Sequence, residues 1–215
     1  PMQAASDKIE ILVKGRGGHG ARPHHTVDPV LVSGHLITAI QSLVSRNLSA
    51  FDQAVISICA LQAGNVQAMS VIPEHALLVG TVRTYTQAIQ DDIERRLTHL
   101  CQTMAQSFGA TAQVKYQRGY PATVNTPEEA HFVADVASRL VGEERVIRNM
   151  IPSMGAEDFS FMLQAKPGAY IRIGQGSADG PGKHPLHNNR YDFNDDILPL
   201  GAALHASLVE AAMPL

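Results

Sequence analysis

The sequence predicts a chain in two parts, an α+β domain of the split βαβ kind over about the first 110 residues and an α/β segment from Gly119 onwards. Three observations predict this. In the first part, alternating apolar runs and runs of helical periodicity follow one another as β-α-β-β-α-β. In the second part helices dominate, and only two short runs are typical of strands. The 215 residues are 45% hydrophobic and 17% charged, which is enough for a sizeable core.

The first part opens with an alternating strand over residues 8–15 that stops at a glycine-rich loop. Asp28-Pro29 provides an N-cap and a first-turn proline for a helix to about Asn47, on which Val30, Ile37, Ile40 and Val44 have helical spacing. Strands are expected over 54–62 and 76–84, a helix over 86–108 ended by Gly109, and a strand over 111–118. This order predicts two helices that cover one face of a four-stranded sheet.

In the second part, Thr126-Pro127-Glu128-Glu129 predicts a capping box that begins a helix to about Leu140. We further expect a strand near 145–148, a helix near 157–164, a strand over 169–174 and a final helix from about Asp195 to Ala212. Two strands are too few for a stable open sheet. This part is therefore expected to belong to a larger layer whose other strands lie elsewhere.

Composition limits the classes of function. The net charge of −3 and the pI near 6.4 offer no sustained basic surface, which argues against nucleic acid as a partner. No segment approaches the roughly 20 apolar residues that span a bilayer. Cys59 and Cys101 lie in apolar runs and are expected to be reduced core thiols, which favours a cytoplasmic location. The chain begins without an initiator methionine or a secretory signal, and we expect it to be part of a longer protein.

Of the ten histidines, five are expected to be packing or surface residues, because they lie alone within predicted helices or at a strand start: His35, His75, His99, His131 and His205. The others lie in loops. The loop around His19 is rich in glycine, which allows close backbone approach to a ligand, and its imidazole can donate a hydrogen bond to an oxyanion or bind a metal. The alternative is a tight turn whose histidines are merely solvated.

Two further loop clusters carry candidate groups. His187 follows the strand expected at 169–174, and loops at the carboxyl ends of α/β strands bind ligands. A single imidazole cannot hold an ion, because at least three protein ligands are needed, so its co-ligands are expected outside this sequence. Glu157 and Asp158 follow a glycine at an expected helix start, where the helix dipole alone accounts for carboxylates and a place at the mouth of a site is the functional alternative.

These clusters, in this order, resemble the M20 family of metallopeptidases and amidohydrolases, in the branch of hippurate, N-acyl-amino-acid and auxin-conjugate hydrolases. The resemblance spans essentially the whole chain and rests on five stretches in register: Gly15 to His24 with Asp28-Pro29, Val71-Ile72-Pro73 leading to Gly80-Thr81-Val82-Arg83-Thr84, Tyr120-Pro121 with Asn125, Gly155 to Phe159, and Leu186-His187-Asn188 running into Tyr191 to Asp195.

The resemblance implies a fold and an activity. Residues 6–117 would be the ferredoxin-like lid and dimerisation domain, and residues 118–215 the C-terminal part of an α/β metallohydrolase catalytic domain whose N-terminal part is absent. The intact protein would use two divalent ions (zinc, manganese, nickel or cobalt) to hydrolyse the amide bond of small N-acyl amino acids, as a homodimer. The ions would polarise the amide carbonyl and activate a water, a glutamate would take its proton, and the fragment alone would be inactive.

The resemblance also assigns roles to residues. His187 matches the C-terminal metal ligand, and His19 matches the lid histidine that reaches the substrate, often in the partner's site. Arg83, Asn125 and Glu157 match positions near the substrate. One position departs from the pattern, because Ser70 stands where the family usually has asparagine. That departure leaves a pseudoenzyme open as a rival. A second rival is a non-catalytic dimerisation or ligand-sensing module, because the split βαβ fold does not determine function.

Overall fold

A computed structural model describes residues 1–176 and 180–213. The described chain divides into two compact units. Unit 1 comprises Pro1–Thr123 together with Pro152–Phe161, and unit 2 comprises Val124–Ile151 and the described residues from Met162 onwards. No helix among these residues is both long and apolar enough to cross a membrane.

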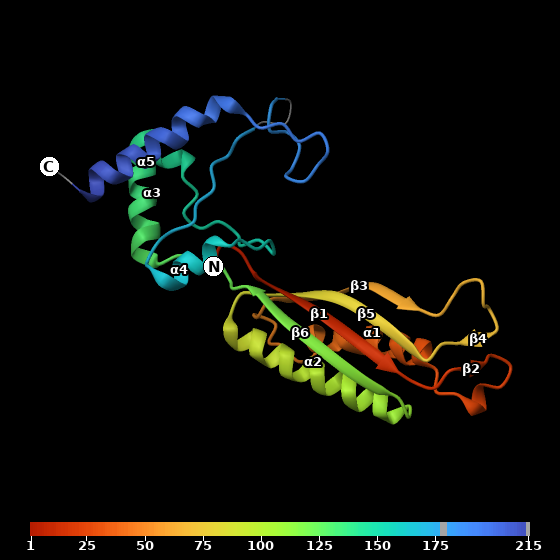
Figure 1. Ribbon diagram of the computed structural model, residues 1–215. Helices are drawn as coiled ribbons and strands as arrows, with labels where there is room; N and C mark the ends of the chain where they lie inside the picture. The colour runs from red at the N-terminus through yellow and green to blue at the C-terminus, as the bar shows by residue number, and fades with distance from the viewer. Residues whose placement is uncertain (177–179, 214–215) are drawn as a thin grey trace. The chain divides into compact units, whose positions relative to one another are not determined.

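Unit 1 contains a four-stranded antiparallel sheet with the strand order β3-β5-β1-β6 (Figure 1). The predicted order β-α-β-β-α-β is confirmed, with two additions, a short ribbon and a 3-10 turn after the first strand. The elements of this unit are β1 (Ala5–Lys14), β2 (Gly18–His19), η1 (Pro23–His25), α1 (Pro29–Ser45), β3 (Ala54–Ala63), β4 (Val71–Ile72), β5 (His75–Thr84), α2 (Gln87–Ser107) and β6 (Thr111–Tyr120).

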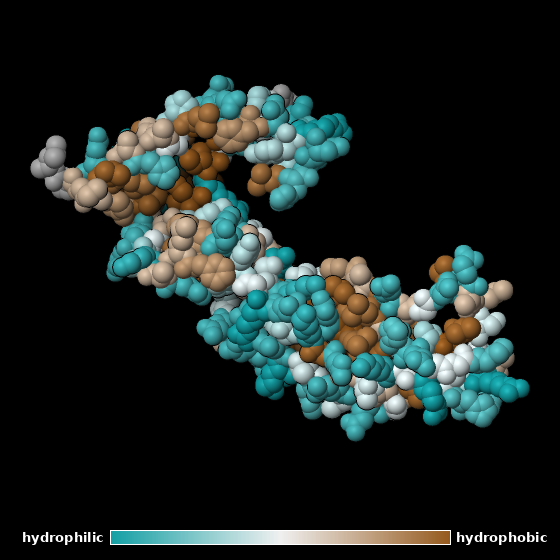
Figure 2. Space-filling view, viewed as in Figure 1, coloured by the Kyte–Doolittle hydropathy of each residue, from teal (hydrophilic) through white to brown (hydrophobic). Residues whose placement is uncertain are grey.

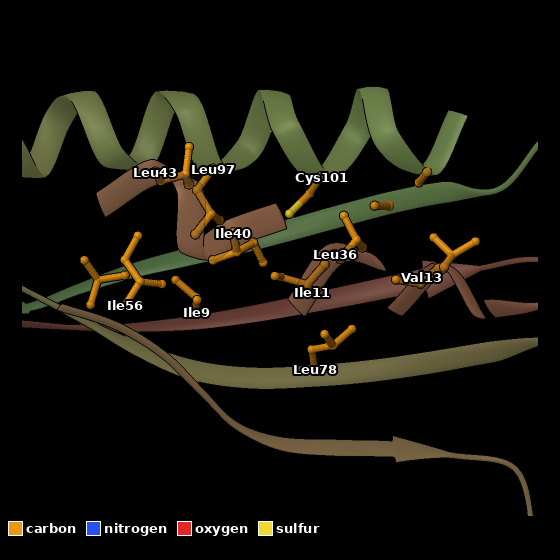
Figure 3. Close-up of a cluster of buried hydrophobic side chains, with 14 of the residues drawn as sticks. Ile9, Ile11, Val13, Leu36, Ile40, Leu43, Ile56, Leu78, Leu97 and Cys101 are labelled. Atoms are coloured by element: carbon orange, nitrogen blue, oxygen red, sulfur yellow. The ribbon is translucent and has the colours of Figure 1, made fainter. Parts of the chain in front are cut away.

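Helices α1 and α2 cover one face of this sheet, and the core lies between them and the strands (Figure 3). Alternate residues of β1, namely Ile9, Ile11 and Val13, are fully buried and point toward the helices. Full burial of one such side chain contributes about 1.5–3 kcal/mol. The core side chains of the helices are Leu36, Ile40 and Leu43 from α1 and Ile93, Leu97, Cys101 and Ala105 from α2.

Helix α1 begins as predicted, and three of the four residues of its expected apolar stripe contact the core: Ile40 is buried, and Ile37 and Val44 are partly buried against it. The Asp28 side chain accepts hydrogen bonds from the backbone N–H groups of Val30 (2.8 Å) and Leu31 (3.4 Å), which confirms the N-cap. Val30, which belongs to the expected apolar stripe, is 42% exposed, whereas Val32 and Leu36 are buried. The helix is apolar on more than one side, so periodicity alone does not decide which side meets the sheet.

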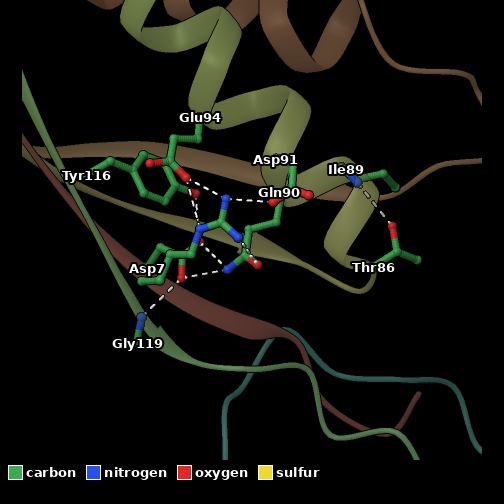
Figure 4. Close-up of polar contacts among 9 residues, drawn as sticks. Asp7, Thr86, Ile89, Gln90, Asp91, Glu94, Tyr116 and Gly119 are labelled. Carbon is green, nitrogen blue, oxygen red and sulfur yellow. Dashed lines mark hydrogen bonds and ion pairs between the residues drawn. The ribbon is translucent and has the colours of Figure 1, made fainter.

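A buried carboxylate joins β1, α2 and β6 (Figure 4). Asp7 is 2% exposed and accepts hydrogen bonds from Gln90 Nε2 (2.9 and 2.7 Å), the Tyr116 hydroxyl (2.6 Å) and the Gly119 N–H (3.2 Å). Burial and the Asp7 hydrogen bond raise the pKa of Tyr116 well above 10.0. Since folding raises this pKa, the resulting stabilisation is complete below pH 10 or so and is lost as the pH rises beyond it.

The same network surrounds a β-bulge in β6. The register of β1 and β6 shifts between Ser6 and Asp7, which leaves Gly119 as the extra residue. A Cβ atom on Gly119 would lie 2.2 Å from the Ser6 carbonyl oxygen, so only glycine fits there. Arg118, beside it, forms ion pairs with Asp91 and Glu94 of α2.

Three segments of unit 1 meet at one place. Gln3 forms isolated bridges with Thr123 and with Ser153. The backbone N–H of Met2 donates to the Thr123 carbonyl (2.7 Å), and the N–H of Ala4 donates to the Ser153 carbonyl (3.1 Å). The start of β1, the chain after β6 and the returning segment near Ser153 are therefore held together at the same end of the sheet.

Unit 2 is built from helices and irregular segments. The remaining elements of the chain are α3 (Pro127–Val141), η2 (Glu143–Arg145), α4 (Phe159–Ala165), which continues from unit 1, η3 (Asp195–Ile197) and α5 (Leu198–Ala212), and α3 packs against α5.

The two strands expected in unit 2 were wrong. Residues 143–145 form a 3-10 turn and 146–148 an irregular segment, and residues 169–174 have no strand pairing. A strand needs a neighbour to accept its hydrogen bonds, and the described part of unit 2 offers none.

The capping box at Thr126 was also wrong. Its hydroxyl caps no helical N–H and instead accepts from the backbone N–H of Gly168 (3.1 Å), so a competing partner takes the group that the sequence pattern assigns to the helix.

The expectation of two core thiols holds for one cysteine only. Cys101 lies in the core, and burial raises its pKa to about 12. Cys59 is exposed on β3, at the irregularity where the register between β3 and β5 shifts. An extra residue in the edge strand interrupts the alternation and turns this side chain to solvent.

These environments predict different thiol reactivity. At neutral pH an aromatic disulfide reagent should modify Cys59 rapidly, whereas Cys101 should react only after denaturation, because its thiolate is scarcely populated and its sulfur is inaccessible. The test counts the aromatic thiolate that the reagent releases before and after the denaturant is added. The control is Cys59→Ser. Fast release of two equivalents from the native protein would contradict the buried position of Cys101.

A second prediction concerns Asp7. Asp7→Ala should lower the free energy of unfolding by about 2 kcal/mol or more, because the buried Gln90 amide and the half-buried Tyr116 hydroxyl lose their acceptor and each such loss costs roughly 1–3 kcal/mol. Asp7→Asn, which keeps an acceptor oxygen, should lose less. Urea denaturation followed by circular dichroism measures both, and equal losses in the two variants would argue against the hydrogen-bond explanation.

Candidate functional site

His19 lies on a two-stranded ribbon at the end of β1. Strand β2 pairs with β4, and His19 lies opposite Val71. The glycines before it permit this close approach: a Cβ atom on Gly15 would lie 2.0 Å from the Val27 carbonyl oxygen, and one on Gly17 would lie 2.8 Å from that of Ile72. Glycine at these positions lets the loop fold back on itself and present the imidazole.

The His19 ring is oriented by its own turn. The Ala21 backbone N–H donates to His19 Nδ1 (3.1 Å), and the Arg22 N–H donates to the His19 carbonyl (2.8 Å). A nitrogen that accepts a hydrogen bond carries no proton, so the neutral ring has its proton on Nε2. The exposed imidazole therefore presents an N–H donor to any ligand that reaches it.

Arg83 lies on the face of the sheet that the helices leave open. Its neighbours Val82 and Thr84 are buried toward the helices, and the alternation of the strand directs Arg83 to the opposite side. The guanidinium is half-buried and makes no hydrogen bond or ion pair with any residue that the structure describes. A half-buried guanidinium without a partner is suited to bind a carboxylate with two parallel hydrogen bonds.

Glu157 belongs to the returning segment of unit 1, near the start of β1. The expected helix begins at Phe159, so Glu157 precedes it, and its carboxylate accepts from the Asp158 N–H (3.1 Å). The Ala4 N–H donates to the carbonyl of Gly155 (2.9 Å), which fixes the segment to β1. Glu157 and Arg83 thus lie toward the same end of the sheet, since Arg83 pairs with Ser6.

His19 lies at the opposite end of this sheet. Along β5, Arg83 is opposite Ser6 while His75 is opposite Lys14, and the loop carrying His19 continues beyond that point. Eight residues of extended strand span about 26 Å at about 3.3 Å per residue. An N-acyl amino acid is comparable to two residues and spans on the order of 7–10 Å. His19 and Arg83 of one chain therefore cannot contact the same small substrate.

In unit 2, Asn125 acts as a clamp on the backbone. Its Nδ2 donates to the Tyr170 carbonyl (2.9 Å), and its Oδ1 accepts from the Tyr170 N–H (2.8 Å). Thr126 adds a backbone bond, from its N–H to the Gly168 carbonyl (3.0 Å). Both amide atoms of Asn125 are engaged, so this side chain holds the segment that leads toward the His187 loop.

His187 is exposed and has a left-handed backbone conformation, with φ of 69°. It is the third residue of a turn closed by the hydrogen bond from the Asn188 N–H to the Pro185 carbonyl (3.2 Å). Left-handed backbone is uncommon for residues other than glycine, and histidine is among those that tolerate it. The turn projects the imidazole from the loop.

The described residues do not form a metal site by themselves. His187 has the right donor for zinc, manganese, nickel or cobalt, but no group of three histidine, cysteine or carboxylate side chains gathers anywhere in residues 1–176 and 180–213. His187 can supply one ligand, and the co-ligands expected from the sequence must come from other residues.

Sequence reasoning missed the residues that hold the His187 loop. Gln175 Nε2 donates to the Tyr191 hydroxyl (2.9 Å), and Gln175 Oε1 accepts from the Asn194 N–H (3.4 Å). The Gly182 N–H donates to the Asp192 carbonyl (2.9 Å). The only signal for this in the sequence is a glutamine directly after a short apolar run, which is too common to be informative.

Comparison with known proteins identifies the family. The model of peptidase family M20/M25/M40 matches residues 9–211. The chain belongs to this family. The family resemblance inferred from the sequence motifs is therefore confirmed, and the M20 family contains peptidases and amidohydrolases that act on amide bonds.

Curated and solved members of the M20 family resemble the chain over nearly all of its length. A hippurate hydrolase from Campylobacter jejuni is 35% identical over 207 residues, which cover 96% of this chain and 52% of that protein. A putative aminohydrolase from methicillin-resistant Staphylococcus aureus has a TM-score of 0.85 and 26% identity, covering 97% of this chain and 52% of the other.

The Bacillus subtilis YXEP protein, described as a dinuclear metal binding peptidase from the M20 family, has a TM-score of 0.77 and 25% identity, covering 99% of this chain and 51% of the other. The chain thus spans about half the length of the M20 proteins that it matches.

Proposed function

We propose that the intact protein is a metal-dependent amidohydrolase that cleaves small N-acyl amino acids, and that this chain carries its lid and the C-terminal part of its catalytic domain. The single observation that carries the proposal is the match of residues 9–211 to the M20 family. The similarity to a hippurate hydrolase and to a Bacillus subtilis N-acetylcysteine deacetylase favours N-acyl amino acids as the substrate class.

The geometry of three side chains supports roles in this reaction. The Nε2–H of His19 would donate to the carbonyl oxygen of the scissile amide and stabilise the negative charge that develops there. The unpaired guanidinium of Arg83 would bind the free carboxylate of the substrate. Glu157 lies near the same end of unit 1 as Arg83 and would line the substrate site.

Unit 2 would supply one metal ligand and a side chain that holds the segment leading to it. His187 would be one ligand of two divalent ions bound by the intact protein, and these ions would polarise the amide and activate water. Asn125, proposed from the sequence as a substrate contact, would act here by holding the segment at Tyr170 that leads to the His187 loop.

The separation of His19 from Arg83 favours a dimer in which each site uses both chains. The edge strand β3 provides a surface for it, because its ten residues, Ala54–Ala63, include no charged side chain. Charged residues usually protect an exposed edge strand, as Lys115 and Arg118 do on the other edge, β6. We therefore propose that the ferredoxin-like domain over residues 6–117, which lies within unit 1, is the lid and the dimerisation domain. We also propose a cytoplasmic location, which the two free cysteines, Cys59 and Cys101, support.

The first test compares the chain with the intact protein. The purified 215-residue chain should not hydrolyse N-benzoylglycine or N-acetylcysteine, because its described residues gather no metal site, whereas the intact protein loaded with zinc, manganese, nickel or cobalt should. Release of amino acid measured with a ninhydrin assay decides this. Turnover by the chain alone would refute the division of the site, and a metal-loaded intact protein without turnover would favour a pseudoenzyme.

The second test asks whether one site uses two chains. Full-length His19→Ala and Arg83→Ala should each lose at least about a hundredfold in kcat/KM, since each removes a group that acts on the substrate. Mixing the two variants after dissociation and reassociation should restore about a quarter of the wild-type rate, because half of the dimers are mixed and each has one intact site of two.

The matched control mixes His19→Ala with itself, which should restore nothing. Full activity of His19→Ala would instead support a non-catalytic lid, and inactive mixed dimers would show that both residues serve one chain.

A further inference from the structure

Three apolar side chains stand out in solvent close to His19. Val66 is 92% exposed, Met69 is 97% exposed and Val71 is 60% exposed, and all three lie in or directly after the loop between β3 and β4. Figure 2 shows apolar surface at this end of unit 1. Clustered exposed apolar residues on a soluble unit mark a surface that contacts something else.

The loop holds these side chains in place. The Ala68 N–H donates to the Asn65 carbonyl (2.9 Å), the Gln67 N–H donates to Asn65 Oδ1 (2.9 Å), and the Val71 N–H donates to the Ala68 carbonyl (3.0 Å). The loop is thus two consecutive turns whose backbone groups are paired. Val66 and Met69 each occupy the second position of one of these turns. Their side chains are therefore exposed on a hydrogen-bonded loop.

Val71, one of these three residues, shares one face of the ribbon with the imidazole. Val71 lies directly opposite His19 in the ribbon of β2 and β4, and the Gly20 N–H donates to the Ser70 carbonyl (2.7 Å). His19 and Val71 are therefore a pair flanked by hydrogen bonds, with Cβ atoms about 4.5–5.5 Å apart and both side chains on the same side. A molecule bound at His19 therefore lies next to Val71, and Met69 precedes Val71 by two residues in the second turn.

We propose that Val71 and Met69 form the contact surface for an apolar acyl group of the substrate, and so determine specificity. This rests on the proposed function, because it needs His19 at the scissile carbonyl. An N-acyl amino acid extends from that carbonyl in two directions. The amino-acid side carries the carboxylate that Arg83 would hold, and the acyl side remains for the apolar surface beside His19. The substrate class is then an amino acid with a large apolar acyl group, such as benzoyl or a medium-chain fatty acyl group.

The test measures selectivity in the full-length enzyme. Val71→Thr keeps the shape and the β-branching of the side chain, and Met69→Ser shortens an exposed one, so both variants should fold. For each, kcat/KM is measured on N-acetylglycine, N-benzoylglycine and N-octanoylglycine. The preference for the large acyl groups over acetyl should fall by about tenfold or more, since apolar contacts of this size discriminate by about 10–200-fold.

The control variant is Phe51→Ser, an equally exposed apolar residue, at 95%, which precedes β3 at the end of the sheet far from His19. It should leave the preference unchanged. A second series, N-acetylglycine against N-acetylphenylalanine, varies the amino-acid side while the acyl group stays constant, and the ratio in this series should not change in Val71→Thr or Met69→Ser.

Two results would overturn the assignment. If both variants keep the wild-type acyl preference within twofold, the surface does not contact the acyl group. If the amino-acid series shifts instead, the surface contacts the other half of the substrate. An inactive wild-type enzyme on every substrate would refute the proposed function itself, and this outcome is distinct from an active enzyme with unchanged preference.

Discussion

The constraint on which unit 1 depends is the central strand β1, which is paired on both sides. All ten of its residues pair with β5 and Ser6–Lys14 pair with β6, while Ile9, Ile11 and Val13 anchor it to the helices. A strand fixed in this way cannot bend enough to bring its two ends together. The groups at one end, near Arg83, and at the other, near His19, are consequently separated by a rigid spacer, so that His19 and Arg83 of one chain cannot contact the same small molecule.

Most of unit 1 was predictable because its elements are long and their patterns are strong. The alternation in β1 identifies it as a strand, and the cap at Asp28 marks the start of helix α1. What could not be predicted depends on contacts between distant residues. The buried face of α1 depends on where the sheet lies, and the exposure of Cys59 depends on a shift of pairing with β5, neither of which has a local signature.

Unit 2 was predicted less well for a different reason. Its short apolar runs have the composition of strands, but an extended segment becomes a strand only where another backbone accepts its hydrogen bonds. At residues 168–170 one backbone bond, from the Thr126 N–H to the Gly168 carbonyl, is joined by three bonds to the side chains of Asn125 and Thr126. Side chains that replace a strand neighbour leave no periodic pattern in the sequence, because any amide or hydroxyl at the right position can do so.

The candidate site shows the same division. The motifs identified His19, Arg83, Glu157, Asn125 and His187 as residue types suited to the chemistry. Distance and orientation needed the fold, since the tautomer of His19 follows from the Ala21 N–H and its apolar neighbours follow from the pairing with Val71. The sequence motifs identify which chemical groups are present, whereas the pairing of the strands determines which of these groups lie next to one another.

The meeting of Gln3 with Thr123 and Ser153 has a consequence for how such a protein can vary. The start of β1 and the chain after β6 are neighbouring backbone segments, so the elements between them form a module whose two ends meet. Insertions or deletions within this module can therefore leave the backbone outside it undisturbed, provided that the few backbone bonds where its ends meet are preserved.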